Sequence, residues 1–196
     1  RQRLSELSCP LPGRHQFLNA ALALAAVELL DLQGWPIKSD AIIHGLSKTT
    51  WEGRLEVVRN EPLLILDGAH NPGGAAVLKQ FLDESKRKRS GRRVILVVGI
   101  LKDKAIRAIL RFLEPLADTV ILTRSEDQRA AAPEDLLKRM PRSGKTVIVD
   151  RVPEAIQRAL TLARPEDLIC VTGSLYTVGE AKAFLSGRGQ PSRLKG

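Results

Sequence analysis

The chain has 196 residues, of which 43% are hydrophobic and 27% charged, so it can bury a core and gives no sign of disorder. Its net charge of +9 invites a nucleic-acid partner, but aromatic residues make up only 4% and no recognition-module signature occurs, so we expect no specific nucleic-acid binding. Cys9 and Cys170 fit no metal-ligand or C-x-x-C spacing, which favours free thiols and a cytoplasmic protein.

The first 50 residues are expected to be helical. Residues 15–32 predict one long helix with apolar residues on nearly every side, which implies burial on several faces. Asn19, Glu28 and Asp31 interrupt this run, which therefore falls short of the roughly 18 uninterrupted apolar residues of a membrane span. We therefore expect a buried helix and no membrane contact. A shorter helix is expected over residues 39–46, with Ser39 as its N-cap.

From residue 51 onward the periodicity changes. After a polar connector and a short strand at 55–59, apolar strands are expected at 63–66, 94–99, 119–122, 146–149 and 168–172. Amphipathic helices are expected between them, at 72–88, 104–116, 134–140 and 153–163, with a last helix from residue 174. This alternation predicts an α/β fold, a Rossmann-like, mostly parallel sheet with helices on both faces.

The segment LLILDGAHNP, residues 63–72, is the turn around which this sheet is organised. Asn71 suits an N-cap and Pro72 the first helical position, so a strand, a tight turn and a helix start follow one another. Ligands of open α/β sheets bind at such strand ends. Asp67 and His70 then have two possible roles. They face one phosphorylated ligand beside the helix N-terminus, or Asp67 caps the turn and His70 is an exposed loop residue.

Two further polar residues allow two interpretations. Ser174 follows the last strand and is first of all an N-cap, although its hydroxyl and the following N–H groups also suit a carboxylate. Asn19 lies inside an apolar helix and needs a partner for its amide, which is either an ordinary buried hydrogen bond or the base edge of a nucleotide.

Four motifs in order along the chain carry a resemblance: GRHQFLNA at 13–20, WEGRLE at 51–56, DGAHNP at 67–72 and GSLY at 173–176. Together they resemble the C-terminal part of the folylpolyglutamate synthase/dihydrofolate synthases, members of the Mur ligase family. Peptidoglycan ligases of the same superfamily usually carry Tyr in place of Gly68. The resemblance implies that residues 1–50 are the last helices of a central ATP-binding domain and residues 51–186 a C-terminal glutamate-binding α/β domain. We expect residues 187–196 to be a flexible tail.

The resemblance also implies a reaction. ATP phosphorylates a carboxylate of dihydropteroate or folate, and the amine of L-glutamate attacks the acyl phosphate. Carried over by motif, Asn19 contacts the adenine, Arg54 the phosphates, and Asp67 the ribose or adenine side. His70 is the catalytic candidate, near the γ-phosphate and the incoming glutamate, and Ser174 is a weaker candidate for the glutamate pocket.

The family's Gly-rich phosphate loop, its Mg²⁺ ligands and its modified lysine belong to sequence upstream of this chain. We therefore expect ATP, Mg²⁺, folate or dihydropteroate and L-glutamate to serve a longer parent enzyme, and this chain alone to be inactive. Two alternatives stay open: a non-catalytic nucleotide-binding or interaction module, and a Mur-type ligase for another acid and amine. We also expect Phe17, Leu22, Leu24 and Leu29 to be exposed in a monomer and to favour self-association.

Overall fold

The computed structural model describes residues 7–141 and 145–187. The tail predicted at 187–196 therefore lies, from residue 188 on, outside the described residues. The chain divides into two compact units, Arg1–Arg54 and Leu55–Gly196. We call them unit 1 and unit 2 and describe each by itself.

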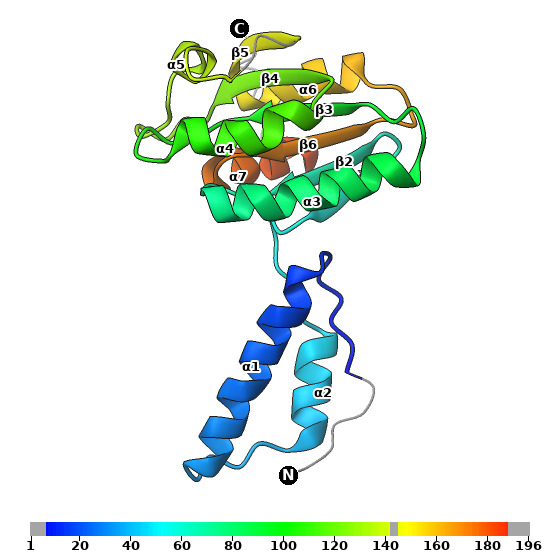
Figure 1. Cartoon of the computed structure of the whole chain (residues 1–196), viewed down its shortest axis with the longest axis vertical. Coiled ribbons are helices and arrows are strands. Elements are labelled where there is room, and N and C mark those ends of the chain that lie inside the picture. The colour runs from blue at the N-terminus through cyan, green and yellow to red at the C-terminus, as the bar shows by residue number, and fades with distance from the viewer. Residues whose placement is uncertain (1–6, 142–144, 188–196) are drawn as a thin grey trace, which may run out of the picture. The chain divides into compact units, whose positions relative to one another are not determined.

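Unit 1 contains two helices, α1 (His15–Leu32) and α2 (Ser39–Ser47) (Figure 1). The predicted ends of α1 are confirmed. The prediction of Ser39 as an N-cap is wrong by one residue, because Lys38 has the extended backbone of the cap and Ser39 is already helical.

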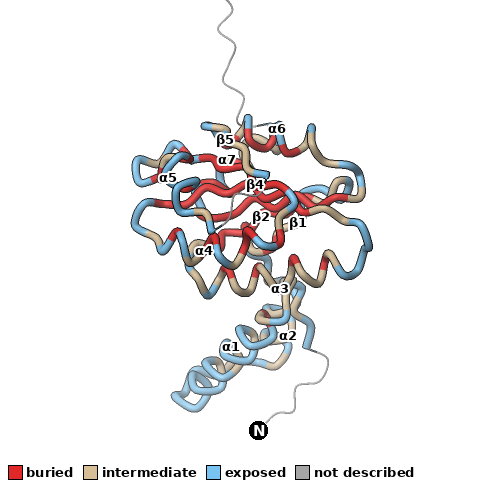
Figure 2. Tube along the Cα trace, turned by 45° about the horizontal axis from the view of Figure 1, so that its top comes forward, coloured by how far each residue is buried: buried red, intermediate tan, exposed pale blue. Residues whose placement is uncertain are grey.

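The expected burial of α1 is wrong for this chain. Gln16 is the one buried residue of the helix, and most of α1 is exposed along its length (Figure 2). Phe17, Leu22 and Leu29 are exposed as expected, whereas Leu24 is half-buried. The physical reason is that unit 1 has too few residues to cover α1, because its other helix, α2, is short and has no buried residue of its own.

By length and composition alone, α1 is long and apolar enough to cross a bilayer, with a mean hydropathy of 1.2. Among the helices of the described ranges, only α1 meets this criterion. Core helices of soluble proteins and signal sequences have the same properties. No membrane assignment follows from them.

Unit 2 is built on one six-stranded sheet in the order β1-β2-β6-β3-β4-β5 (Figure 1). The strands are β1 (Glu56–Asn60), β2 (Leu63–Asp67), β3 (Val94–Val98), β4 (Thr119–Arg124), β5 (Thr146–Arg151) and β6 (Leu168–Thr172). β1 runs antiparallel to β2, and every other neighbouring pair is parallel. The predicted mostly parallel sheet is confirmed.

Helices cover both faces of this sheet. One face packs against α3 (Pro72–Lys88), α4 (Ile106–Leu113) and α5 (Pro133–Leu137), and the other against α6 (Val152–Leu162) and α7 (Leu175–Leu185). Alternate strand residues belong to opposite cores, with Ile65 on the first face and Leu64 and Leu66 on the second. The central strands read as uninterrupted apolar runs because both of their faces are buried (Figure 2).

Two helices end earlier than predicted, and a proline is responsible each time. Pro115 has no N–H to continue the α-helical ladder, so α4 ends at Leu113 and a 3-10 turn, η1 (Glu114–Leu116), follows. Pro141 disfavours helical backbone at Met140, so α5 ends at Leu137.

The strand order brings the predicted motifs to one place. From β5 the chain returns through α6 to the middle of the sheet, where β6 lies between β2 and β3. Asp67 at the end of β2 is therefore the neighbour of Thr172 in β6, and Thr172 is the neighbour of Val98 in β3. This edge, where the strand order reverses, is where open α/β sheets hold ligands.

Candidate functional site

The β2–α3 turn has the geometry that its sequence predicts. Asn71 is the N-cap of α3, its Oδ1 accepting from the N–H of Gly74 at 2.8 Å, and Pro72 stands in the first turn. This helix N-terminus thus starts directly after β2, at the carboxyl edge of the sheet. Its partial positive charge favours an anionic group there.

Asp67 holds this turn together. Its carboxylate accepts hydrogen bonds from the backbone N–H of Ala69 at 2.9 Å and from that of Leu55 at 3.0 Å. The residue is only 7% exposed, and Leu55, which has a positive φ of 48°, packs into the core beside it. Both hydrogen bonds serve the structural one of the two roles that the sequence leaves open. Asp67 ties the residue after Arg54 to the end of β2.

His70 is oriented by its own turn. Its Nδ1 lies 2.8 Å from the carbonyl oxygen of Gly68. A carbonyl only accepts, so Nδ1 carries the proton and the neutral ring keeps its lone pair on Nε2. In the described part of the chain Nε2 has no hydrogen-bond partner, and the ring is half-buried. His70 therefore offers a free acceptor nitrogen beside the N-terminus of α3.

Ser174 is confirmed as the N-cap of α7. Its Oγ accepts from the N–H of Thr177 at 3.0 Å and lies 2.8 Å from the Thr177 hydroxyl, which in turn donates to the carbonyl of Gly99 at 3.1 Å. Ser174 is almost fully buried. These bonds join the start of α7 to the end of β3, so the hydroxyl acts here as a structural link.

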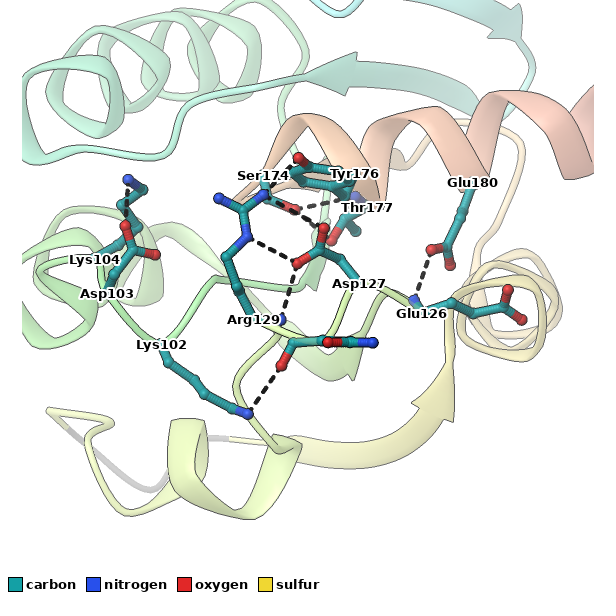
Figure 3. A network of polar contacts seen from close by, with 11 residues as sticks. Lys102, Asp103, Lys104, Glu126, Asp127, Arg129, Ser174, Tyr176, Thr177 and Glu180 are labelled. Atoms are coloured by element: carbon teal, nitrogen blue, oxygen red, sulfur yellow. Dashed lines mark hydrogen bonds and ion pairs between the residues drawn. The ribbon is translucent and has the colours of Figure 1, made fainter.

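A polar clasp holds the loop after β4 against α7 (Figure 3). Arg129 donates to the hydroxyl of Tyr176, its guanidinium lies 5.1 Å from the centre of that ring, and its Nε donates to Asp127 at 3.1 Å. The Arg129 carbonyl also accepts from the N–H of Lys102 at 2.8 Å. Loops from β3 and β4 and the helix after β6 are thereby fixed to one another.

Lys102 and Asp103 belong to the loop after β3, at the same edge of the sheet. The Lys102 ammonium donates to the Gln128 carbonyl, and Asp103 pairs with Lys104 at 2.7 Å. A hydrogen bond from Lys104 lowers the pKa of Asp103. Asp103 does not cap α4, whose N-cap is Ala105.

The two remaining predicted site residues belong to unit 1. Asn19 is exposed, and its Nδ2 donates to Oε1 of Gln16 at 2.9 Å, so the amide has its partner within one turn of α1. Arg54 is half-buried, follows Gly53 with its positive φ of 68°, and makes no ion pair within the described ranges. Its guanidinium is therefore available to an anion.

Comparison with known proteins agrees with this architecture. Residues 53–175, more than half of the chain, match the family described as Mur ligase, glutamate ligase domain. The chain belongs to that family. The matched region includes Arg54, Asp67, His70 and Ser174.

Named relatives point to folate ligases. The dihydrofolate synthase/folylpolyglutamate synthase of Mycobacterium tuberculosis is 35% identical over 198 residues, which cover 92% of this chain and 40% of that protein. The structure of the M. tuberculosis folylpolyglutamate synthase complexed with ADP superimposes with a TM-score of 0.82 at 33% identity, over 93% of this chain and 42% of that one. A bifunctional folylpolyglutamate synthase/dihydrofolate synthase with Mn, AMPPNP and L-glutamate bound gives a TM-score of 0.80 at 33% identity, over 95% and 43%. The chain spans about two fifths of the length of these relatives.

In this Mur ligase domain, sequence reasoning brought together Asp67, His70 and Ser174, which do lie at the ends of the neighbouring strands β2 and β6. It missed Arg129, and it missed Glu180 of α7, whose Oε1 accepts from the N–H of Glu126 at 2.7 Å. It quoted Tyr176 only as part of a motif. The polar run 125–129 was a usable signal, because it follows a buried strand directly. The spacing of residues along the sequence could not predict which helix this run would contact.

Proposed function

We propose that this chain is part of an ATP-dependent ligase that adds L-glutamate to dihydropteroate or folates through an acyl phosphate. The observation that supports this most directly is the free Nε2 of His70 beside the N-terminus of α3, in a domain whose relatives are named folylpolyglutamate synthases. A basic nitrogen and a helix N-terminus at one sheet edge suit a reaction in which phosphate charge develops and an amine loses a proton.

Each predicted residue has a role in this proposal. Arg54 offsets phosphate charge, since its guanidinium has no carboxylate partner among the described residues. Asn19 contacts the adenine. His70 is the catalytic candidate near the γ-phosphate and the incoming amine. Asp67 holds the turn and reaches the ribose side, and Ser174 positions α7 at the glutamate pocket.

The residues present fit a nucleotide better than they fit a metal. Within unit 2, a helix N-terminus and a free imidazole nitrogen suit phosphate, which ATP would supply for activation of the acid. No group of three or more His, Cys, Asp or Glu side chains suited to a metal ion occurs among residues 7–141 and 145–187. We propose that the Mg²⁺ ligands lie, with the phosphate loop, in the part of the relatives' length that this chain does not span.

We further propose that unit 1 is the end of a central ATP-binding domain and that residues 51–186 are the glutamate-binding domain. The matched relatives are more than twice as long as this chain, which leaves room for such a domain before it. The exposed apolar residues of α1 would then be covered by the remainder of that domain. The two free cysteines suit the reducing cytoplasm in which we place the enzyme.

Calorimetric titration of this chain with AMPPNP tests the nucleotide part of the proposal. We expect weak binding that Arg54→Ala reduces about tenfold or more, because a charge-assisted arginine–phosphate contact is lost. Arg87→Ala is the matched control, since Arg87 is exposed on α3, carries the same charge and has no proposed role. Equal weakening by the two variants would mean that net charge alone attracts the nucleotide, and would contradict the role of Arg54.

A turnover assay tests the domain assignment. This chain with ATP, Mg²⁺, dihydropteroate and L-glutamate is expected to release no phosphate and form no amide. Ligase turnover by the purified chain would show that the phosphate loop is not needed, and would overturn the assignment.

The second candidate function is a binding module without a ligase half, which the two-fifths coverage of the relatives favours. Reading the coding sequence upstream of Arg1 separates the two candidates. A Gly-Lys-Ser or Gly-Lys-Thr phosphate loop there supports the ligase, and its absence supports the module.

A further inference from the structure

The amino edge of the sheet, opposite the edge that carries Asp67 and His70, is formed in part by three neighbouring segments. They precede β2, β6 and β3, which follow one another in the sheet, and their bounds are 59–62, 164–167 and 89–93. The three segments lie together at one end of unit 2 (Figure 1). Side chains that are far apart in the sequence are therefore gathered along this edge.

Backbone hydrogen bonds fix the three segments to one another. The N–H of Leu63 donates to the carbonyl of Asp167 at 3.1 Å, and the N–H of Leu168 donates to the carbonyl of Arg93 at 2.9 Å. Neighbouring strands of a sheet lie about 5 Å apart, so charges on adjacent segments are separated by about one strand spacing. The edge is thus a rigid support for whatever charge its side chains carry.

That charge is positive. Arg93 pairs with the buried Asp167. Among the described residues, four further arginines of the edge form no ion pair: Arg59, Arg89, Arg92 and Arg164. The other carboxylates of the three segments are those of Glu61, which is exposed, and Glu166, which is half-buried. Unpaired cations therefore outnumber the remaining carboxylates, and the edge attracts anions.

A tight turn brings two of these arginines close together. The N–H of Arg92 donates to the carbonyl of Arg89 at 3.2 Å, and Gly91 supplies a positive φ of 78°. Burial lowers the pKa of Arg92, and the charge of Arg89 lowers it further. Two like charges held this close repel each other, so an anion that binds both of them removes an unfavourable interaction.

The composition of the edge indicates which anion it suits. None of the exposed large hydrophobic side chains belongs to the three segments, so the edge lacks the apolar residues that centre a protein interface or insert into a bilayer. The segments also contain no aromatic residue on which unpaired bases could stack. Guanidinium groups, in contrast, bind phosphate oxygens through two parallel hydrogen bonds. These features favour the phosphates of a base-paired nucleic acid.

We propose that the amino edge binds the phosphate backbone of double-stranded nucleic acid, independently of base sequence, through Arg89, Arg92 and Arg164. Such binding needs no recognition module, because backbone contacts carry no sequence information. The net charge of +9 on the chain strengthens the attraction. The surface lies at the opposite edge of the sheet from Asp67 and His70, and the proposal does not depend on the ligase function.

Fluorescence anisotropy of a labelled DNA duplex of about 20 base pairs, titrated with this chain, tests the proposal. At about 50 mM salt we expect a dissociation constant on the order of micromolar, equal for two duplexes of different sequence. Three phosphate contacts predict that log K falls with log salt concentration with a slope of about −3. Arg89→Gln/Arg164→Gln removes two of these contacts, and is expected to weaken binding about tenfold or more and to reduce the slope to about −1.

Arg107→Gln/Arg158→Gln is the matched control. It removes the same charge from exposed arginines of α4 and α6, which lie outside the three segments, and should leave the affinity and the salt slope nearly unchanged. Thermal unfolding checks that both double variants keep the fold. The side chains of Arg89 and Arg164 form no hydrogen bond with any described residue, so we expect no loss of stability from their replacement.

Four outcomes would overturn the proposal. The first is equal weakening by the two double variants, which would mean that net charge alone attracts the duplex. The second is tighter binding of a single strand with the same number of phosphates, or of phosphatidylglycerol vesicles, which would assign the edge to a different ligand. The third is a loss of binding in Arg54→Ala but not in Arg89→Gln/Arg164→Gln, which would place the duplex at the ligase site. The fourth is no binding at about 50 mM salt.

Discussion

At the scale of single residues, two glycines let the ends of β3 and β6 touch. Gly173 has a φ of +106°, and a Cβ there would lie 2.6 Å from the Gly99 carbonyl oxygen and 2.9 Å from Ile100. Gly173→Ala is therefore expected to lower the free energy of unfolding by about 2–4 kcal/mol, from backbone strain and overpacking together. Urea denaturation measures it.

Gly179→Ala in α7 is the control for this glycine. A Cβ at Gly179 meets nothing within 4 Å, so a helix-interior alanine should raise the free energy of unfolding by about 0.5–1 kcal/mol. An unchanged free energy of unfolding in Gly173→Ala would show that the ends of β3 and β6 can move apart at little cost, and would contradict this account.

Asp167 binds Arg93 and Arg164 at the opposite end of the sheet. Its carboxylate, 1% exposed, accepts from the guanidinium and N–H of Arg93 and from the N–H of Arg164. Burial raises the pKa of Asp167, but these hydrogen bonds outweigh it and hold the pKa below its usual value. Asp167→Asn should lower the free energy of unfolding by about 2 kcal/mol at neutral pH.

The contribution of these contacts to stability depends on pH because the pKa of Asp167 is lowered. The carboxylate's contribution is fully present above the unfolded pKa of about 3.9 and is lost as the pH falls through the lower folded value. The stability difference between the wild type and Asp167→Asn should therefore shrink below about pH 4. Asp150→Asn is the control, because its pair with Arg124 is exposed and should matter by less than about 1 kcal/mol. A difference that stays constant down to acid pH would contradict this account of Asp167.

At the scale of elements, the two N-caps differ in burial. Asn71 caps α3 at the surface, where water can replace its bond to Gly74, so Asn71→Ala should cost about 1 kcal/mol. Ser174 is buried, and Ser174→Ala leaves the Thr177 N–H without an acceptor, so its cost should approach about 2–3 kcal/mol. Thermal unfolding of both variants compares them. A larger effect at Asn71 would mean that water reaches the Ser174 site.

Elements were predictable from the sequence wherever local chemistry decides them. The buried strands could be predicted because they are apolar runs in the sequence. The helix starts at Asn71-Pro72 and at Ser174 could be predicted because an N-cap depends only on the nearest few residues. The clasp of Arg129 on Tyr176 joins residues 47 positions apart, and the contact of Glu180 with the Glu126 N–H joins residues 54 apart. Such pairs are set by the strand order and leave no trace in periodicity. Asp67 was ambiguous for the same reason, since its partner Leu55 lies just before β1 and 12 residues away.

At the scale of the whole molecule, the two units bury their apolar residues very differently. Unit 2 encloses a core on each face of its sheet, whereas α1 leaves Phe17, Leu22 and Leu29 exposed by 68%, 70% and 60%. Because exposing apolar side chains to water is unfavourable, association with any surface that covers this face of α1 lowers the free energy. In a longer ligase the rest of the proposed ATP-binding domain would do so. In this chain alone a second copy is the available partner.

The chain is therefore expected to self-associate through α1, with a molar mass that rises with concentration in light scattering. The double variant Leu22→Glu/Leu29→Glu places two charges on the apolar face and should restore a monomer. Leu137→Glu is the control, because Leu137 is also an exposed leucine but belongs to α5 in unit 2. If the wild-type chain is a monomer at every concentration, the exposed face of α1 has too little area to drive association. If Leu137→Glu dissociates it equally well, the contact lies on unit 2 instead.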